Sequence, residues 1–279
     1  MVALERCLAY TKIISEKPNA LPVDETLENW PSKGKISFKD FSVKYRPDTE
    51  IVINHITLEI EPGEKIGIVG RTGSGKSTIA LCLFRLLEPT TGTISIDDVD
   101  ITTIGLDKLR KNITIIPQDP TLMEGSLRFN IDPLGLYTDK EIEDVMKDIG
   151  FWYICESTDD KGDKRGLDML ITENGSNISI GEKQLICIAR AILRKSKIVV
   201  MDEATASIDI NTENIIQTAI TKLLSQSTII TIAHRIKTII HSDRILVLER
   251  GEIAEYNTPE KLLENKSSLF YELYSKSNI

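Results

Sequence analysis

One eight-residue stretch constrains the fold of this chain more than any other feature of its sequence. Residues 70–77 read G-R-T-G-S-G-K-S and lie between a short apolar run, 65–69, and an apolar stretch with helical spacing, 77–87. A glycine-rich turn between a strand and a helix lets backbone N–H groups close around a phosphate, and the helix N-terminus adds its positive dipole end. The sequence therefore predicts a strand-loop-helix unit that binds phosphates.

The side chains of this loop suit a nucleotide and a magnesium ion. Lys76 brings a point charge to the β- and γ-phosphates, and the Ser77 hydroxyl is a Mg²⁺ ligand of the preferred kind. The alternative, a structural glycine turn with a solvated lysine, does not explain the flanking strand and helix. The predicted nucleotide contacts in the loop are Gly70, Thr72, Gly73, Ser74, Gly75, Lys76, Ser77 and Thr78.

Composition limits the classes of partner. The chain has 279 residues with 34 Lys+Arg against 42 Asp+Glu, a net charge of −8, which argues against a general nucleic-acid binder because such proteins need a basic face. No apolar run approaches the ~18 residues of a membrane-spanning helix, and no secretory signal begins the chain. Four scattered cysteines without C-x-x-C spacing indicate neither zinc nor a disulfide framework.

The order of apolar segments predicts an α/β fold. Strand-length runs at 113–116, 198–201, 227–232 and 244–248 alternate with helical segments, which is typical of a mostly parallel sheet covered by helices. β-type patterns at 36–45 and 51–60 precede the phosphate loop. The alternation breaks at about 120–180, where we expect an inserted helical subdomain. Residues 1–34 are expected to form a helix end and a proline-containing linker, and residues 35–279 the main domain.

A second element bears on what the phosphate loop does. The apolar run 198–201 ends in Asp202 and Glu203. Asp202 is expected to hold Mg²⁺ through water beside the phosphate loop of a neighbouring strand, and Glu203 to polarise an attacking water. Two acids after a strand also form turns or helix caps, and it is the upstream loop that favours the catalytic interpretation.

These motifs, in this order, resemble the nucleotide-binding domain of an ATP-binding-cassette (ABC) transporter from about residue 35 onward. The resemblance implies a P-loop NTPase fold: a mostly parallel core sheet with an antiparallel β subdomain and an inserted α-helical subdomain. It implies a Q-loop at Gln118, which senses Mg²⁺ and the attacking water, and a switch histidine at His234 that bonds the γ-phosphate. It also implies a D-loop at 206–209 ending in Asp209, and an adenine-stacking aromatic at Tyr45.

The signature motif departs from the family's usual L-S-G-G-Q. The chain reads I-S-I-G-E at 178–182, so Ser179 and Gly181 are retained, while Ile180 and Glu182 replace glycine and glutamine. In the family, two domains pair head to tail and the signature of one clasps the γ-phosphate bound by the other. A carboxylate facing that phosphate adds repulsion unless it turns away. We expect the site completed by this signature to be weaker than a standard one.

Further details resemble the second nucleotide-binding domain of subfamily C, the multidrug-resistance-associated type. They are the run S-I-G-E-K-Q at 179–184, the run F-N-I-D-P at 129–133 and the retained acid Glu203. The resemblance implies ATP and Mg²⁺ as ligands, and a second nucleotide-binding domain and transmembrane domains as partners. It implies a location at the cytoplasmic face of a membrane, with 172–175 near the coupling helices and Met1 not a natural start.

Two other functions stay open at this point. A regulatory module that binds nucleotide without hydrolysing it is compatible with the altered signature, although Glu203 and His234 favour hydrolysis. A soluble ATPase of the same superfamily, without membrane domains, is disfavoured by the linker and by the absence of an inserted coiled coil or tandem cassette. The transported substrate and the direction of transport are not encoded in these residues.

Overall fold

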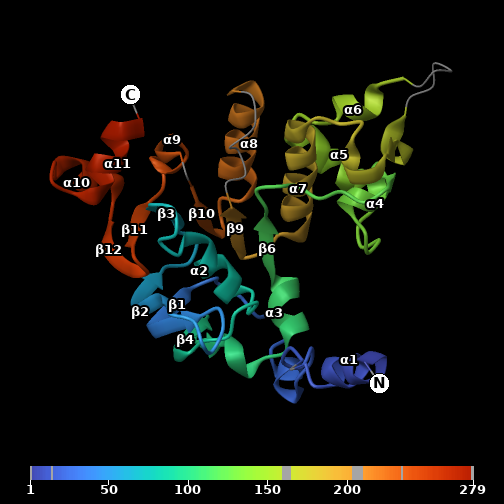
Figure 1. Ribbon diagram of the computed structural model, residues 1–279. Coiled ribbons are helices and arrows are strands. Elements are labelled where there is room, and N and C mark those ends of the chain that lie inside the picture. Colours follow the sequence, from blue (N-terminus) through green and yellow to red (C-terminus); the bar gives the residue numbers. More distant parts are fainter. Residues whose placement is uncertain (1, 14, 159–164, 203–209, 234, 278–279) are drawn as a thin grey trace.

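The computed structural model describes residues 2–13, 15–158, 165–202, 210–233 and 235–277, arranged around two β-sheets and a lateral group of helices (Figure 1). The larger sheet has the order β12-β11-β3-β10-β9-β6. Its strands are β3 (Lys65–Gly70), β6 (Ile113–Ile116), β9 (Ile198–Asp202), β10 (Thr228–Ile232), β11 (Arg244–Glu249) and β12 (Glu252–Asn257). All neighbours are parallel except β11 and β12, so the predicted mostly parallel core sheet is confirmed.

The smaller sheet is antiparallel, with the order β2-β1-β4-β5. It comprises β1 (Ile36–Lys44), β2 (Ile51–Ile60), β4 (Thr91–Ile96) and β5 (Val99–Asp100). Helix α2 (Lys76–Leu83) packs with the inner faces of both sheets in one apolar cluster that includes Phe38, Phe41 and Ile79. The predicted antiparallel subdomain is thus confirmed, and it packs with the larger sheet around α2, the helix that follows the phosphate loop.

The helical region lies to one side of the core sheet (Figure 1). It contains α4 (Leu127–Ile131), α5 (Asp139–Asp148) and α6 (Tyr153–Glu156), with the two-stranded ribbon of β7 (Gly125–Ser126) and β8 (Leu170–Ile171). A second apolar cluster joins it to α7 (Ile180–Arg194), α8 (Ile210–Leu223) and the strands β6 and β9. The prediction of an inserted helical unit between the strands of the sheet is confirmed. The sequence alone did not reveal the β7-β8 ribbon within it.

The remaining helices cover the ends of the structure. Helix α3 (Leu106–Asn112) leads into β6, and α9 (Ile236–Ile239), α10 (Pro259–Glu264) and α11 (Leu269–Ser277) pack near β11 and β3 around the buried Phe270. Helix α1 (Val2–Thr11) projects from the body beside α3 and exposes Leu4, Leu8 and Tyr10 (Figure 1). None of the helices in the described ranges has the length and apolar composition needed to span a bilayer.

The segment between α1 and β1 is fastened to the β subdomain rather than extended. Trp30 is 6% exposed, joins the main apolar cluster and donates from Nε1 to the Ile96 carbonyl at 2.9 Å. Asp24 accepts from Gly105 N at 2.9 Å, and Arg110 pairs with Glu16. The division of the chain at residue 34 stays a prediction, but the residues just before it contribute to the core of the domain.

Asp97 is the main polar anchor of this segment. Its carboxylate accepts from the backbone N–H groups of four consecutive residues, at 2.7–2.9 Å: Ser32, Lys33, Gly34 and Lys35. Backbone donors bound to a charged acceptor form strong hydrogen bonds. The Asp97 side chain therefore fixes the backbone of the four residues that lead into β1 of the smaller sheet.

We predict that Asp97→Asn lowers the free energy of unfolding by about 1–3 kcal/mol, because one of the two acceptor oxygens and the charge are lost. Asp98→Asn is the matched control, since Asp98 is exposed and shares the left-handed backbone conformation, with φ of 63° against 46° for Asp97. Urea unfolding of the three chains measures the difference. Equal midpoints for Asp97→Asn and Asp98→Asn would contradict the anchoring role.

Candidate functional site

Within the phosphate loop, the Lys76 side chain is hydrogen-bonded to the backbone of the loop itself. The Lys76 ammonium donates to the carbonyls of Gly70 at 2.8 Å and Arg71 at 3.1 Å, across the mouth of the loop. Lys76 is 5% exposed, and Ser74 and Thr78 are similarly buried. The loop is therefore closed around the lysine at the N-terminus of α2, where the helix dipole favours an anion.

Neighbouring atoms lie so close to two positions of the loop that only glycine fits there. At Gly70 a Cβ would lie 2.3 Å from the Leu248 carbonyl oxygen and 2.5 Å from Ser74 Oγ. Gly75, the residue before α2, has a φ of 101°, and a Cβ there would lie 2.5 Å from Ile53 Cδ1. Only glycine fits both the space and the backbone conformation. Ser74 Oγ, buried beneath the loop, has no hydrogen-bond partner among the described residues.

The other predicted residues of the described part gather at the same edge of the core sheet. Strands β3, β10, β9 and β6 are parallel, so their carboxyl ends lie together, and ligands bind at such an edge. Asp202 closes β9, and Gln118 follows β6 by two residues. The structure therefore brings the phosphate loop, the acid and the glutamine to one side of the sheet.

One detail of the sequence prediction is wrong. Asp202 does not lie on the strand beside that of the phosphate loop, because β10 separates β9 from β3, with Asp202 opposite Ile232 and Ile232 opposite Ile68. Two strand spacings amount to about 10 Å between these backbones. The order of strands in a sheet depends on long-range pairing, which apolar runs do not report. The carboxyl end of β10 thus lies between the loop and the acid.

The donor set fits a magnesium ion. Ser77 is exposed at the first turn of α2, Asp202 is half-buried and Gln118 is exposed, so this edge carries a hydroxyl, a carboxylate and a side-chain amide. Mg²⁺ takes few protein oxygens, because it retains water and binds phosphate oxygens in such sites. The side chains present are therefore of the kind that hold Mg²⁺ together with a nucleotide.

Tyr45 lies beside the phosphate loop, at the end of β1. Its hydroxyl is 3.0 Å from Thr78 Oγ1 in the first turn of α2, and the side chain is 50% exposed. The half-exposed ring is thus placed at the rim of the loop, which is compatible with base stacking. Its role as the adenine-stacking residue stays a prediction. Glu203, Asp209 and His234 lie outside the described residues, and so do their predicted roles.

The signature segment forms the N-terminus of α7, far along the chain from the loop. Ser179 caps this helix, with Oγ accepting from the Glu182 N–H at 3.2 Å, and Ser179 and Ile180 are exposed. The Glu182 carboxylate turns back and accepts from Ser179 N and Ser179 Oγ, both at 2.8 Å. The carboxylate therefore does not point away from the retained serine.

Gln184 is a functional candidate that the sequence interpretation treated only as part of a motif. It is 1% exposed, and its Nε2 donates to the carbonyls of Pro117 at 2.9 Å and Gln118 at 3.0 Å. This side chain ties the helix that carries the signature to the backbone of the predicted Q-loop. The available signal was a glutamine on the apolar face of an amphipathic helix, a position that calls for a buried hydrogen-bond partner.

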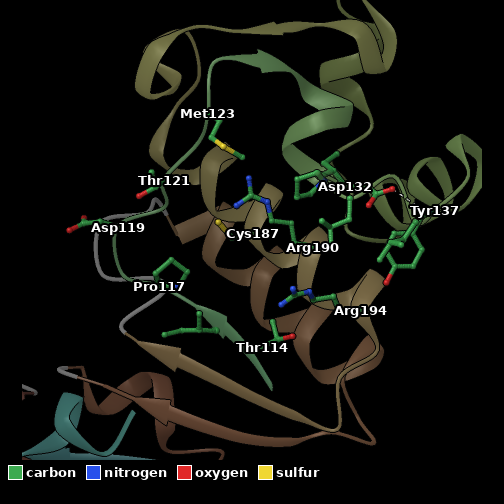
Figure 2. A pocket seen from close by; sticks show the side chains of 15 residues that line it. Thr114, Pro117, Asp119, Thr121, Met123, Asp132, Tyr137, Cys187, Arg190 and Arg194 are labelled. Atoms are coloured by element: carbon green, nitrogen blue, oxygen red, sulfur yellow. Dashed lines mark hydrogen bonds between the residues drawn. The ribbon is translucent and has the colours of Figure 1, made fainter. Parts of the chain in front are cut away.

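A groove of about 440 Å³ opens between β6, the segment after Gln118, α4 and α7. Figure 2 shows Arg190 and Arg194 reaching into it from α7. Burial lowers the pKa of Arg190, whose Nε donates to the Asn130 carbonyl. Exposed apolar side chains, among them Met123, Leu134 and Leu136, line the same groove.

Comparison with known proteins agrees with this geometry. The profile of the ABC transporter family matches residues 53–206, more than half of the chain, and this range runs from within β2 past Asp202. The chain therefore belongs to the ABC transporter family, as a nucleotide-binding domain. Binding of ATP follows from that membership.

The relatives belong to subfamily C. Bile pigment transporter 1 of Saccharomyces cerevisiae is 46% identical over 99% of this chain, which covers 18% of that protein. ATP-binding cassette sub-family C member 2 of Rattus norvegicus is 46% identical over 97% of the chain, covering 17% of that protein. A bacterial Atm1-family ABC exporter solved with ATP bound matches the whole chain with a TM-score of 0.84 and 31% identity, over 47% of its own chain. The chain thus spans less than a fifth of these two curated relatives.

We predict that Gln184→Leu lowers the free energy of unfolding by about 1–3 kcal/mol, because two carbonyls lose their buried donor. Gln217→Leu in α8 is the control, since that side chain is half-buried beside a surface cavity. Chemical denaturation, followed by the fluorescence of the two tryptophans, Trp30 and Trp152, measures the change. A Gln184→Leu chain as stable as the Gln217→Leu chain would show that the tie contributes nothing.

Proposed function

We propose that this domain binds and hydrolyses Mg-ATP in a head-to-tail pair with a second nucleotide-binding domain, and so drives export through attached transmembrane domains. The observation that carries the proposal is the closed loop around Lys76 at the carboxyl edge of a parallel sheet, in a chain of the ABC transporter family. The exporter-type relatives support the direction of transport.

The predicted site residues have different roles, which follow from their side-chain chemistry. Lys76, the loop N–H groups and the end of α2 bind the phosphates, and Tyr45 stacks on the base. Ser77, Asp202 and Gln118 would hold a Mg²⁺ ion, which would neutralise phosphate charge. Glu203 accepts a proton from the attacking water, and His234, two residues after β10 in the sequence, bonds the γ-phosphate.

The second nucleotide-binding domain completes the site. Ser179 and Gly181 would reach the ATP held by the partner, and Asp209 would lie at the same interface. Support comes from the exposure of Ser179 and Ile180 at the N-terminus of a 15-residue helix, where unpaired backbone N–H groups favour a phosphate. We assign the chain to the second nucleotide-binding position of a subfamily C transporter because it keeps the acid Glu203.

The transmembrane domains would dock in the groove of Figure 2. A helix end that fills this groove meets Leu134 and Leu136, which are 67% and 68% exposed. The segment Glu173–Gly175 lies close by, since a Cβ on Gly175 would be 3.2 Å from Leu122, next to the groove residue Met123. Docking here would link membrane helices to Gln118 and, through Gln184, to the signature. It would also place the domain at the cytoplasmic face of a membrane.

Two substitutions in the phosphate loop test whether this loop binds ATP. We expect Lys76→Ala to weaken ATP binding by roughly tenfold or more, because the phosphates lose a charge-assisted contact. Arg71→Ala removes the same charge from the same loop, but its guanidinium faces Glu272 at 3.5 Å, so affinity should stay close to that of the parent chain. Titration with a fluorescent ATP analogue measures both. Equal losses would refute the assigned phosphate site.

Glu203→Gln, studied alongside these variants in a single-turnover assay, separates hydrolysis from nucleotide-dependent regulation. A hydrolysing domain loses turnover and retains ATP when its general base is neutralised. A regulatory module would show the same negligible turnover in the parent and in the variant. That second result would favour the regulatory function.

If the groove is the docking surface, a substitution there should uncouple ATP hydrolysis from transport without loss of ATP binding. Leu134→Asp in the whole transporter should reduce substrate-stimulated ATP hydrolysis several-fold, because burying an unpaired carboxylate opposes docking. Leu170→Asp is the control, since Leu170 is 72% exposed on β8 and does not line the groove. ATP binding should stay at the parent value in both. Equal stimulation in the two variants would place the membrane domains elsewhere.

A further inference from the structure

The serine of the signature is already hydrogen-bonded within the chain. The Ser179 hydroxyl has one proton and donates it to Glu182 Oε2, with 2.8 Å between Oγ and Oε2. The same oxygen accepts from the Ser179 N–H at 2.8 Å. A hydroxyl donates only one hydrogen bond, so Ser179 cannot donate to a phosphate while it donates to Glu182.

The second oxygen of this carboxylate is held from another element. Tyr153, in α6, donates from its hydroxyl to Glu182 Oε1 at 3.2 Å. Its ring is kept in place by edge contact with the buried Phe151, with centroids 5.7 Å apart. The described structure thus gives the Glu182 carboxylate three donors, two from Ser179 and one from Tyr153.

A second cap in the same chain shows which of these contacts helix capping requires. Thr138 and Glu141 at the start of α5 repeat the geometry, with Glu141 Oε2 accepting from Thr138 N and Thr138 Oγ1, both at 2.8 Å. Both pairs form the reciprocal capping box that is found at the N-terminus of many helices. Among the described residues, no tyrosine hydroxyl is hydrogen-bonded to Glu141. The Tyr153 bond is therefore an addition to the cap of α7 rather than a part of it.

We propose that Glu182 and Tyr153 are positioning residues that hold the Ser179 hydroxyl away from the partner's nucleotide, so that ATP must displace the carboxylate before the site closes. The inference rests on the proposed head-to-tail function and deepens it. An incoming γ-phosphate would meet a negative charge within 2.8 Å of the hydroxyl it has to bind. Like charges at this range repel strongly in a site from which water is excluded.

The cost of displacement falls on nucleotide affinity rather than on the chemical step. Once the serine has turned to the phosphate, the reacting groups on the partner domain are unchanged. The structure therefore implies a raised KM for ATP at the site that receives this signature, with kcat little affected. Glutamine at position 182 would keep an oxygen acceptor for the Ser179 N–H and remove the charge, so that the cap survives.

The test measures ATP hydrolysis against ATP concentration in the whole transporter. We expect Glu182→Gln to lower the KM for ATP by roughly three- to tenfold with kcat within about twofold of the parent. Tyr153→Phe keeps the ring against Phe151 and loses only the hydroxyl, so a smaller decrease in KM is expected. Glu141→Gln makes the same change in the matched cap of α5 and should leave KM unchanged.

Two outcomes would overturn the proposal, and a third would overturn the function on which it rests. An unchanged or raised KM in Glu182→Gln shows that the carboxylate does not oppose ATP. Equal decreases in Glu182→Gln and Glu141→Gln show a general effect of charge on the helical region. Ser179→Ala should raise KM; if it does not, Ser179 does not contact ATP, and the head-to-tail pairing fails independently of Glu182.

Discussion

The rest of the structure depends on the bonds between the Lys76 ammonium and two carbonyls of its own loop. They keep a charged group nearly buried at the N-terminus of α2, where the backbone N–H groups of the loop converge. That arrangement needs glycine where Gly70 approaches Leu248 and where Gly75 turns into the helix. The two sheets pack on α2 and support the loop, and a chain of net charge −8 thereby concentrates positive charge at one place.

A few polar contacts join the helix of the signature to the predicted Q-loop and to the helical region. Gln184 joins the helix of the signature to the backbone at Gln118, and Glu182 joins the same helix to Tyr153 in the helical region. Both residues lie on α7, so the signature, the Q-loop backbone and the helical region are hydrogen-bonded to one helix. The groove in front of α7 is the surface that we propose for an attached membrane domain.

Much of this was predictable, because the fold follows from local patterns. The runs at 51–60, 113–116 and 198–201 are strands, and the prediction of an α/β sheet with an antiparallel layer is confirmed. The family resemblance, stated from ordered motifs, is confirmed as well. Strand order was less accessible: Asp202 was expected one strand nearer to the loop, since nothing local records that β10 inserts between β3 and β9.

The sequence by itself determined the chemistry of the chain: a phosphate loop, an acid after an apolar strand, and a signature in which glutamate replaces glutamine. These depend on residue type and near-neighbour spacing, which the sequence contains. Only the tertiary structure decided where the Glu182 carboxylate points, which side chain joins it, and what Gln184 bonds. Those contacts link Glu182 to Tyr153 and Gln184 to Pro117, residues 29 and 67 positions apart, and such pairs are set by packing rather than by local propensity.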